Sequence, residues 1–265
     1  MSPWEVFAVK YAERNTRTRH DSFMFDENPT AQHSMDYFMW VLRRGDELLL
    51  VDTGYDREEA NQRGRPIQMS PAEALAPLGI TPADVSTIIV THLHYDHAGG
   101  LHLFPDATLH LQAVEMAYAT GPCMNYSALK APFTADHICE VVQRLYAGRV
   151  VFHDGDGEVR EGVTVHLVGG HSKGLQVLRV WTEAGWMCLA LDASHYYENF
   201  QGGKSFPIVI DLKEMFDGFE TIKRLASSPD LIIPGHDPLL FDLFPTYGAD
   251  HIIRLDQGPI KDAGS

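Results

Sequence analysis

Potential metal ligands are concentrated in one short segment of the first half of the chain. Three histidines and one aspartate fall within six residues, in the sequence Thr-His-Leu-His-Tyr-Asp-His that ends at His97. On an extended backbone, residues two apart point the same way, so His92 and His94 can converge on one metal. Asp96 and His97 come after the expected turn and can serve a second one. A single histidine is more often structural, but four ligand-type residues followed by Gly99-Gly100, which allow close backbone approach, indicate a metal site.

The spacing His-x-His-x-Asp-His after an apolar segment resembles the signature of the metallo-β-lactamase superfamily. In that family the other ligands are a distant histidine, an aspartate and a final histidine, each on a loop after a strand. Val51-Asp52-Thr53-Gly54 is similar to an early loop of the family, and the resemblance covers at least Asp52 to Asp237. It implies a two-metal site with seven ligands, which are His92, His94, Asp96, His97, His171, Asp192 and His236.

Within the superfamily the chain is most similar to the N-acyl homoserine lactonase group. Met35-Asp36-Tyr37-Phe38, Asp192-Ala193-Ser194 and Glu198-Asn199-Phe200 carry this likeness. There are two departures. The group usually has a tyrosine three residues after the bridging aspartate, where this chain has His195, and the residues after the fourth histidine are Ser-Lys-Gly-Leu rather than a second histidine motif. Both changes concern the substrate pocket, so the resemblance leaves the identity of the lactone open.

The resemblance implies hydrolysis of a lactone or another cyclic ester. Two neighbouring metals can share a hydroxide and keep it deprotonated at neutral pH, with Asp192 as the bridging carboxylate. The hydroxide would attack the carbonyl carbon, and a metal together with His195 or Tyr196 would stabilise the oxyanion. Asp96 would pass the proton to the departing alkoxide. Imidazole and carboxylate ligands suit zinc first, and also manganese, iron or cobalt.

Other functions are compatible with the same ligands. A thioesterase, an amidase for a small ring and a phosphodiesterase would use the same type of site. A di-iron redox protein would favour more carboxylate ligands and a flavin or electron-transfer domain, for which the chain has no room. A non-catalytic scaffold is disfavoured by the complete ligand set.

Composition limits the partners that we expect. The 265 residues carry a formal net charge of −15, which opposes binding to nucleic acid and to anionic membranes. We therefore expect a small-molecule lactone or ester as the partner, and the oligomeric state stays open. Cys123, Cys139 and Cys188 match no zinc or redox spacing and are expected to be buried, reduced thiols. No signal peptide or membrane-length apolar run is present, so we expect a cytoplasmic protein.

Four apolar segments must position the candidate ligands. Thr87–Val90 comes directly before the histidine cluster. Thr164–Val168, Met187–Leu191 and Leu231–Ile233 come shortly before the three distant ligands. Short apolar runs bounded by turn residues predict strands, and the continuous run before the cluster predicts a strand that is buried on both faces.

The rest of the chain is predicted to alternate irregularly between strands and helices. Met35–Arg43 and Glu47–Asp52 are predicted to form a hairpin, and Ser70–Leu78 a helix with Ser70 as its N-cap. Further strands are predicted at Glu5–Tyr11, Thr108–Leu111, Arg149–His153 and Gln176–Trp181, further helices at Ala98–Phe104, from Ala113, at Thr134–Tyr146 and at Lys213–Ala226, and irregular structure at Gly121–Phe133.

Strands dominate both halves without a strict strand–helix alternation. This layout fits an α/β (α+β) fold in which two mixed sheets face each other with helices outside, but the pattern alone does not distinguish it from other α/β layouts. The resemblance implies the same architecture, the αββα sandwich of the metallo-β-lactamase fold. No linker composition interrupts the chain, so we expect a single hydrolase domain over residues 1–265.

Overall fold

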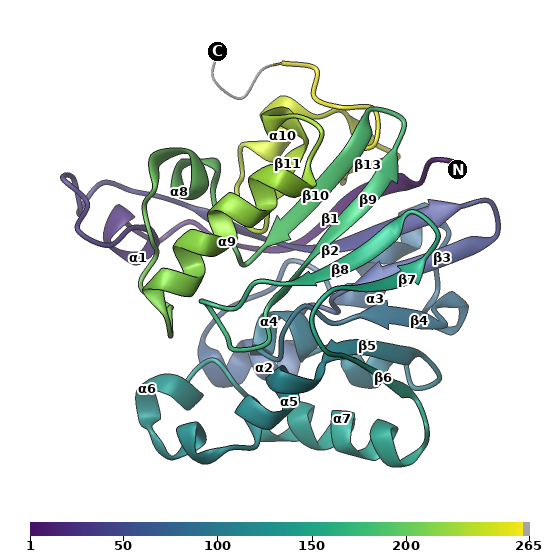
Figure 1. Cartoon of the computed structure of the whole chain (residues 1–265), viewed down its shortest axis with the longest axis horizontal. Coiled ribbons are helices and arrows are strands. Elements are labelled where there is room, and N and C mark those ends of the chain that lie inside the picture. Colours follow the sequence, from purple (N-terminus) through teal and green to yellow (C-terminus); the bar gives the residue numbers. More distant parts are fainter. Residues whose placement is uncertain (262–265) are drawn as a thin grey trace.

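The computed structural model describes residues 1–261 and arranges the strands in two sheets (Figure 1). The larger sheet contains β1 (Glu5–Arg14), β2 (Met35–Arg44), β3 (Glu47–Val51), β4 (Thr87–Ile89), β5 (Thr108–Gln112), β6 (Val150–His153), β12 (Thr246–Tyr247) and β13 (Ala249–Arg254). The smaller sheet contains β7 (Gly157–Arg160), β8 (Val163–Leu167), β9 (Gln176–Thr182), β10 (Gly185–Leu191) and β11 (Ile232–Pro234). The α-helices are α1 (Arg19–Ser22), α2 (Arg57–Arg63), α3 (Pro71–Leu75), α4 (Tyr95–Ala98), α5 (Ala113–Ala119), α6 (Ser127–Lys130), α7 (Ala135–Tyr146), α8 (Tyr197–Gly202), α9 (Leu212–Leu225) and α10 (Leu240–Leu243).

Both sheets mix parallel and antiparallel pairs, as expected. The strand order is β12-β13-β1-β2-β3-β4-β5-β6 in the larger sheet and β11-β10-β9-β8-β7 in the smaller one. In the larger sheet β3, β4, β5 and β6 pair in parallel, whereas the remaining pairs are antiparallel. In the smaller sheet only β10 and β11 are parallel among the described strands.

The central strands of the larger sheet, from β1 to β5, are largely buried on both faces. Along β2, Trp40 and Leu42 join the core that the two sheets share, whereas Met39 and Val41 join a second core under the helices of the larger sheet. This division follows from the strand geometry, since successive side chains point to opposite faces. It also explains why these strands are nearly continuous apolar runs rather than alternating ones.

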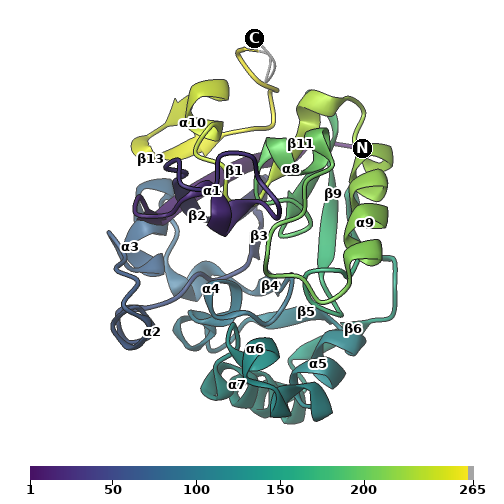
Figure 2. The ribbon, with the colours of Figure 1, turned by 90° about the vertical axis from the view of Figure 1, so that its left-hand side faces the viewer.

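Helices cover the outer face of each sheet. On α9 the buried residues Met215, Phe219 and Ile222 recur at intervals of three and four, which places them on one stripe. This stripe packs against β10, and Figure 2 shows α9 running alongside β9. On the other side α3 packs against β1, and α7 against β6. The order helix–sheet–sheet–helix confirms the αββα sandwich.

Most predicted elements are confirmed, and the errors have physical causes. The Ser70-capped helix ends at Leu75 and continues as a 3-10 turn, because a proline at position 77 disfavours a longer α-helix. The helix predicted at Ala98–Phe104 is confirmed only in part: α4 ends at Ala98, before Gly99-Gly100, and only Leu101–Leu103 form a 3-10 turn. The segment Gly121–Phe133 contains α6 in addition to irregular structure. The strands β7, β12 and β13 and the helices α1, α2, α8 and α10 were not predicted.

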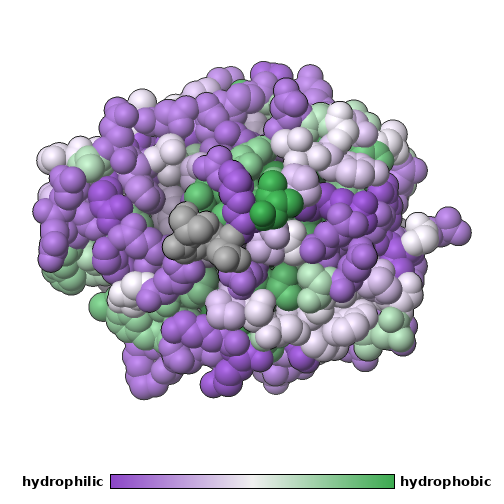
Figure 3. Space-filling model, turned by 90° about the horizontal axis from the view of Figure 1, so that it is seen from above, coloured by the Kyte–Doolittle hydropathy of each residue, from purple (hydrophilic) through white to green (hydrophobic). Residues whose placement is uncertain are grey.

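Two further sequence expectations, on the cysteines and on membrane-spanning segments, can be compared with the structure. The cysteine thiols are all unpaired, but only Cys188 is buried, while Cys123 is partly exposed and Cys139 is exposed. Among residues 1–261, no helix combines the length and apolar character needed to cross a membrane. The face seen from above is mainly hydrophilic, with apolar side chains in small groups (Figure 3).

Truncation of one leucine in the core between the sheets should strongly destabilise the protein. Leu178 of β9 is fully buried and lies beside Leu189 of β10 in the sheet. We expect Leu178→Ala to lower the free energy of unfolding by about 3 kcal/mol, because it leaves a cavity between two sheets. Leu212→Ala is the matched control, since that leucine is 42% exposed and its truncation should change stability by less than about 0.5 kcal/mol. Urea unfolding curves of both variants would measure this, and equal destabilisation would contradict the assigned core.

Candidate metal centre

The candidate ligands all lie at the carboxyl ends of strands. His92, His94, Asp96 and His97 follow β4, and the last two belong to α4. The other three ligands lie on loops after β8, β10 and β11. Because β4 belongs to one sheet and β8, β10 and β11 to the other, the ligands meet where the two sheets open at one edge of the sandwich.

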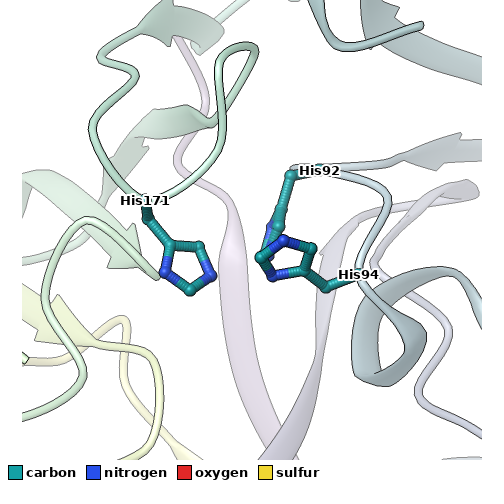
Figure 4. A group of neighbouring side chains, drawn as sticks. All are labelled: His92, His94 and His171. Atoms are coloured by element: carbon teal, nitrogen blue, oxygen red, sulfur yellow. The ribbon is translucent and has the colours of Figure 1, made fainter. Parts of the chain in front are cut away.

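The structure brings the seven predicted ligands together in two groups joined by one carboxylate. His92, His94 and His171 form the first group, and their rings converge in Figure 4. Asp96, His97 and His236 form the second group. Asp192 lies with residues of both groups, and the potential ligand atoms of each combination are within 4.8 Å of one another.

Asp192 is the centre of this arrangement. Its Oδ1 atom lies 3.1 Å from Nε2 of His236 and 3.3 Å from Nε2 of His97. Its Oδ2 atom lies 3.2 Å from Nε2 of His171 and 3.0 Å from Nε2 of His195. The aspartate is 3% exposed, so a single buried carboxylate faces four imidazoles.

Several atoms of this group have no hydrogen-bond partner in the described part of the chain. They are Nε2 of His92, His97 and His171 and Oδ1 of Asp192, and all four are buried. Buried polar atoms are normally satisfied, so each unsatisfied one needs an explanation. Nitrogen and oxygen atoms that face one another without a hydrogen bond are the ligand arrangement around a metal ion. The residues present therefore fit divalent metal, with His/Asp donor sets of the kind that zinc and related ions prefer.

The outward nitrogens of the ligand rings are held by the protein. His97 Nδ1 lies 2.7 Å from Oδ2 of Asp52, and His171 Nδ1 and His236 Nδ1 each lie 2.7 Å from a backbone carbonyl oxygen. An imidazole that donates from Nδ1 presents the lone pair of Nε2 to the metal, so these contacts select the tautomer that can coordinate. They also fix the orientation of each ring before any metal is bound.

Asp52 links this outer layer to the backbone of the histidine loop. Its two carboxylate oxygens accept hydrogen bonds from the backbone nitrogen and the hydroxyl of Thr91, at 2.8 and 2.7 Å. To reach them Asp52 adopts a left-handed conformation with φ of 59°, and Leu191, just before Asp192, does the same with φ of 50°. Such conformations cost roughly 1–3 kcal/mol in residues other than glycine, so the surrounding contacts must enforce them.

Glu115 is a second buried carboxylate that sequence reasoning missed. It accepts hydrogen bonds from the backbone nitrogens of Leu93 and Gly174, at 2.9 and 2.8 Å, and from the hydroxyl of Ser172. It therefore ties the loop of His92 and His94 to the loop of His171. A side chain at Gly174 would lie only 2.3 Å from Cβ of Glu115, so glycine is required for this approach.

Charges within the site shift the pKa values of its histidines in opposite directions. Burial lowers the pKa of His92 and His94 well below the ordinary value, and neighbouring imidazoles add to the effect. Burial alone would also lower the pKa of His97 and His236, but the carboxylates, Asp192 first, outweigh it and raise both. Burial would raise the pKa of Asp192, yet the imidazoles of His97 and His236 hold it well below its usual range.

The three predicted catalytic side chains are placed differently. Asp96 is partly exposed and lines the cavity above the ligands. His195 lines the same cavity, stacked on Phe206 with ring centroids 3.6 Å apart, and its Nε2 faces Asp192. Tyr196 does not line this cavity: its hydroxyl donates to the backbone oxygen of Ser34 at 3.1 Å. We therefore do not retain Tyr196 as a candidate oxyanion donor.

A cavity of about 300 Å³ opens onto the ligands. One wall is apolar and consists of Phe206, Pro207, Ile208, Val209 and Ile210, and Leu129, Ala131 and Pro132 contribute to another. Four arginines line the cavity as well, namely Arg14, Arg17, Arg63 and Arg65. No pattern in the sequence singled these arginines out.

Comparison with known proteins agrees with the geometry. The profile described as the metallo-beta-lactamase superfamily matches residues 36–236, which include all seven candidate ligands. An N-acyl homoserine lactonase from Bacillus cereus is 34% identical over 167 residues, which cover 62% of this chain and 57% of that protein, so the match spans little more than half of that relative. An N-acyl homoserine lactonase from Bacillus thuringiensis is 28% identical over 239 residues, covering 84% of this chain and 86% of that protein.

A solved structure has the same fold. It is an N-acyl homoserine lactone hydrolase with the product N-hexanoyl-L-homoserine bound at its catalytic metal center. It superimposes with a TM-score of 0.73 at 24% identity, covering 90% of this chain and 95% of that one. The family profile covers most of the chain and the ligand set is complete. The chain therefore belongs to the metallo-β-lactamase superfamily, as a metal-dependent hydrolase related to the N-acyl homoserine lactonases.

Proposed function

We propose that this protein opens a lactone or another cyclic ester with two divalent metal ions, zinc in the first place. The observation that carries the proposal is the pair of buried ligand groups joined by Asp192, beneath a cavity of about 300 Å³. His92, His94 and His171 would hold one ion, and Asp96, His97 and His236 the other. When bound, the two ions would supply an activated water molecule and polarise the carbonyl group of the substrate. The lactonase activity named for the relatives supports the lactone as substrate.

The residues of the chain supply positioning and proton transfer. Asp192 lies between the two ligand groups and holds them in one geometry. Asp96 lines the cavity and is the carboxylate that can carry a proton to the departing alkoxide. Burial lowers the pKa of His195 to about 3, so its ring is neutral and offers a single N–H. Nε2 of that ring lies 3.0 Å from Oδ2 of Asp192 and borders the cavity, so it could donate to an oxyanion when the metal ions hold this carboxylate oxygen.

The apolar wall has a role of its own in this proposal. The segment from Phe206 to Ile210 lies over the ligands, and the backbone oxygen of Ile208 also accepts the hydrogen bond from His171. Apolar side chains on this side of the cavity exclude water other than the reacting molecule and strengthen the electrostatic interactions inside.

The three unpaired thiols support the cytoplasmic location that the sequence predicts.

Removal of metal should abolish the activity. Exhaustive chelation is expected to stop hydrolysis of a simple lactone, and added zinc or manganese should restore it. Elemental analysis of the active protein should give about two ions per chain. The same protein should be assayed with a thioester, a cyclic amide and a phosphodiester. A faster reaction with one of these would replace the lactone in the proposal, and activity that survives confirmed metal loss would contradict the metal mechanism.

Metal affinity should depend on pH with a definite sign. The carboxylates raise the pKa of His97 and His236 in the metal-free protein, so both rings hold protons that a metal must displace. Metal affinity should therefore rise with pH. On acidification it should begin to fall at a pH above about 6.5, the ordinary pKa of a histidine side chain. Competition with a chromophoric chelator at pH 6 and pH 8 would measure it. Equal affinity at the two pH values would contradict protonated ligands in the metal-free protein.

Two aspartates should respond differently to substitution. Asp192→Ala removes the carboxylate shared by both ligand groups, so we expect loss of turnover and loss of bound metal. Asp96→Asn keeps the shape of the side chain but removes its charge and its ability to carry a proton. It should lower kcat while much of the metal remains bound. Near-normal kcat in either variant would count against the role assigned to that aspartate.

A matched pair of variants tests the assignment of His195, rather than Tyr196, as the oxyanion donor. His195→Ala should lower kcat by roughly 100-fold, the scale of one lost donor, and should change KM less. Tyr196→Phe should have a small effect, because its hydroxyl is bound to Ser34 outside the cavity. If Tyr196→Phe is the more damaging change, the placement of the donor is wrong. If both variants keep full kcat, no side-chain donor operates.

A further inference from the structure

Three of the four arginines that line the cavity form no salt bridge in the described part of the chain. With 21 basic and 36 acidic residues, the protein pairs most of its arginines with carboxylates. Within residues 1–261, Arg14, Arg17 and Arg65 have no carboxylate oxygen within 4.0 Å, although all three line one cavity. Arg63, the fourth, is paired with Glu59 and donates to the backbone oxygen of Ala131. Its role is structural.

Arg17 is the most unusual of the three. It is 8% exposed, and its Nε atom is buried without a hydrogen-bond partner in the described chain. One of its terminal nitrogens donates to the backbone oxygen of Asp21 at 2.6 Å, which leaves the rest of the guanidinium without a protein acceptor. Asp21 also lines the cavity, and its carboxylate caps α1 by accepting from Thr18 at 2.8 Å. The charge of Arg17 contributes to lowering the pKa of Asp21, but the two side chains form no salt bridge within 4.0 Å. A buried charge without a partner is unfavourable unless something else supplies the opposite charge.

Arg14 and Arg65 connect this positive end of the cavity to the ligands. Arg14 is the last residue of β1 and pairs across the sheet with Met35. The next residue, Asp36, accepts the hydrogen bond from His236. Arg65 donates to the hydroxyl of Tyr95, which directly precedes Asp96 in α4. The arginines are therefore neighbours of the metal centre in the same cavity and belong to different segments of the chain.

We propose that the substrate carries, besides the ring that is opened, an anionic oxygen group, a carboxylate or a phosphate, and that Arg14, Arg17 and Arg65 bind it. This inference rests on the proposed lactone or cyclic-ester hydrolysis and specifies its substrate class. Guanidinium groups donate to such anions in a bidentate, charge-assisted way. An anionic substrate is repelled by the net charge of −15, so a local group of unpaired arginines is needed to attract it. The apolar wall would then contact the part of the substrate between the two polar ends.

The test compares substrates of similar size on the metal-replete protein. Three γ-butyrolactones carry a short side chain that ends in a carboxylate, a phosphate or a neutral carboxamide. We expect kcat/KM to be at least about 10-fold higher for one of the anionic lactones than for the carboxamide. The lactone that reacts faster shows whether the site binds a carboxylate or a phosphate. Equal values for the three lactones would overturn the proposal.

Substitution of the arginines should remove this preference selectively. Arg65→Gln and Arg14→Gln should each lower kcat/KM for the anionic lactone by about 10- to 100-fold, mainly through KM, with little change for the carboxamide. Arg17→Gln should have the same effect. Because Arg17 is buried, the melting temperature of this variant is compared with that of the parent protein. If the variant fails to fold, Arg14→Gln and Arg65→Gln decide the test. Arg57→Gln, an exposed arginine outside the cavity, is the matched control. Equal losses for charged and neutral lactones would overturn the proposal.

A binding measurement separates this inference from the proposed function. If the metal-replete protein hydrolyses none of the three lactones, the proposed function fails. Calorimetric titration then uses the three corresponding ring-opened hydroxy acids. Tighter binding of the hydroxy acid with the second anionic group, lost in Arg65→Gln, would support the arginine site independently of turnover. Equal binding of the hydroxy acids with and without the second anionic group would overturn it.

Discussion

A single buried carboxylate organises this protein. Asp192 is almost fully buried and has four imidazole nitrogens within 3.3 Å of its oxygens. A carboxylate cannot be removed from water alone, so charged or metal-ligating groups must surround it. These groups lie on loops that follow strands of both sheets. The strands must therefore end close together, at one edge of the sandwich. The two-sheet architecture supplies this convergence, and the shared core between the sheets keeps it in place.

The ligands are held by an outer layer that is as specific as the ligands themselves. Asp52 fixes His97 and the backbone of Thr91, while Glu115 joins two ligand loops that are far apart in sequence. The left-handed conformations of Asp52 and Leu191 are tolerated because these contacts determine the backbone there. Close packing completes the layer: a side chain at Gly100 would lie 2.3 Å from the backbone oxygen of Thr53.

The sequence predicted the ligands better than their surroundings. Histidines and aspartates after apolar runs are a local signal, and all seven candidates meet in the structure. The strand β13 was missed because its sequence, Ala-Asp-His-Ile-Ile-Arg, has little alternation of its own and is stabilised by pairing with β1. Glu115 could not be predicted because its partners lie 22 to 59 residues away and two of them are backbone nitrogens. Adjacent residues need not belong to the same site: His195 borders the cavity, whereas Tyr196 does not.

The hydrogen bonds of Glu115 also bear on the order in which the protein matures. Small zinc-binding domains fold only when the ion arrives, because their ligand loops have no other attachment. Here the loops of His92 and His171 are already joined by a carboxylate that belongs to the chain, above a core built from two complete sheets. On the proposed function, these contacts would let the ligand loops take their places before metal is loaded. In a cell short of metal the protein would then be an intact but inactive reserve, which a supply of ions could activate without new synthesis.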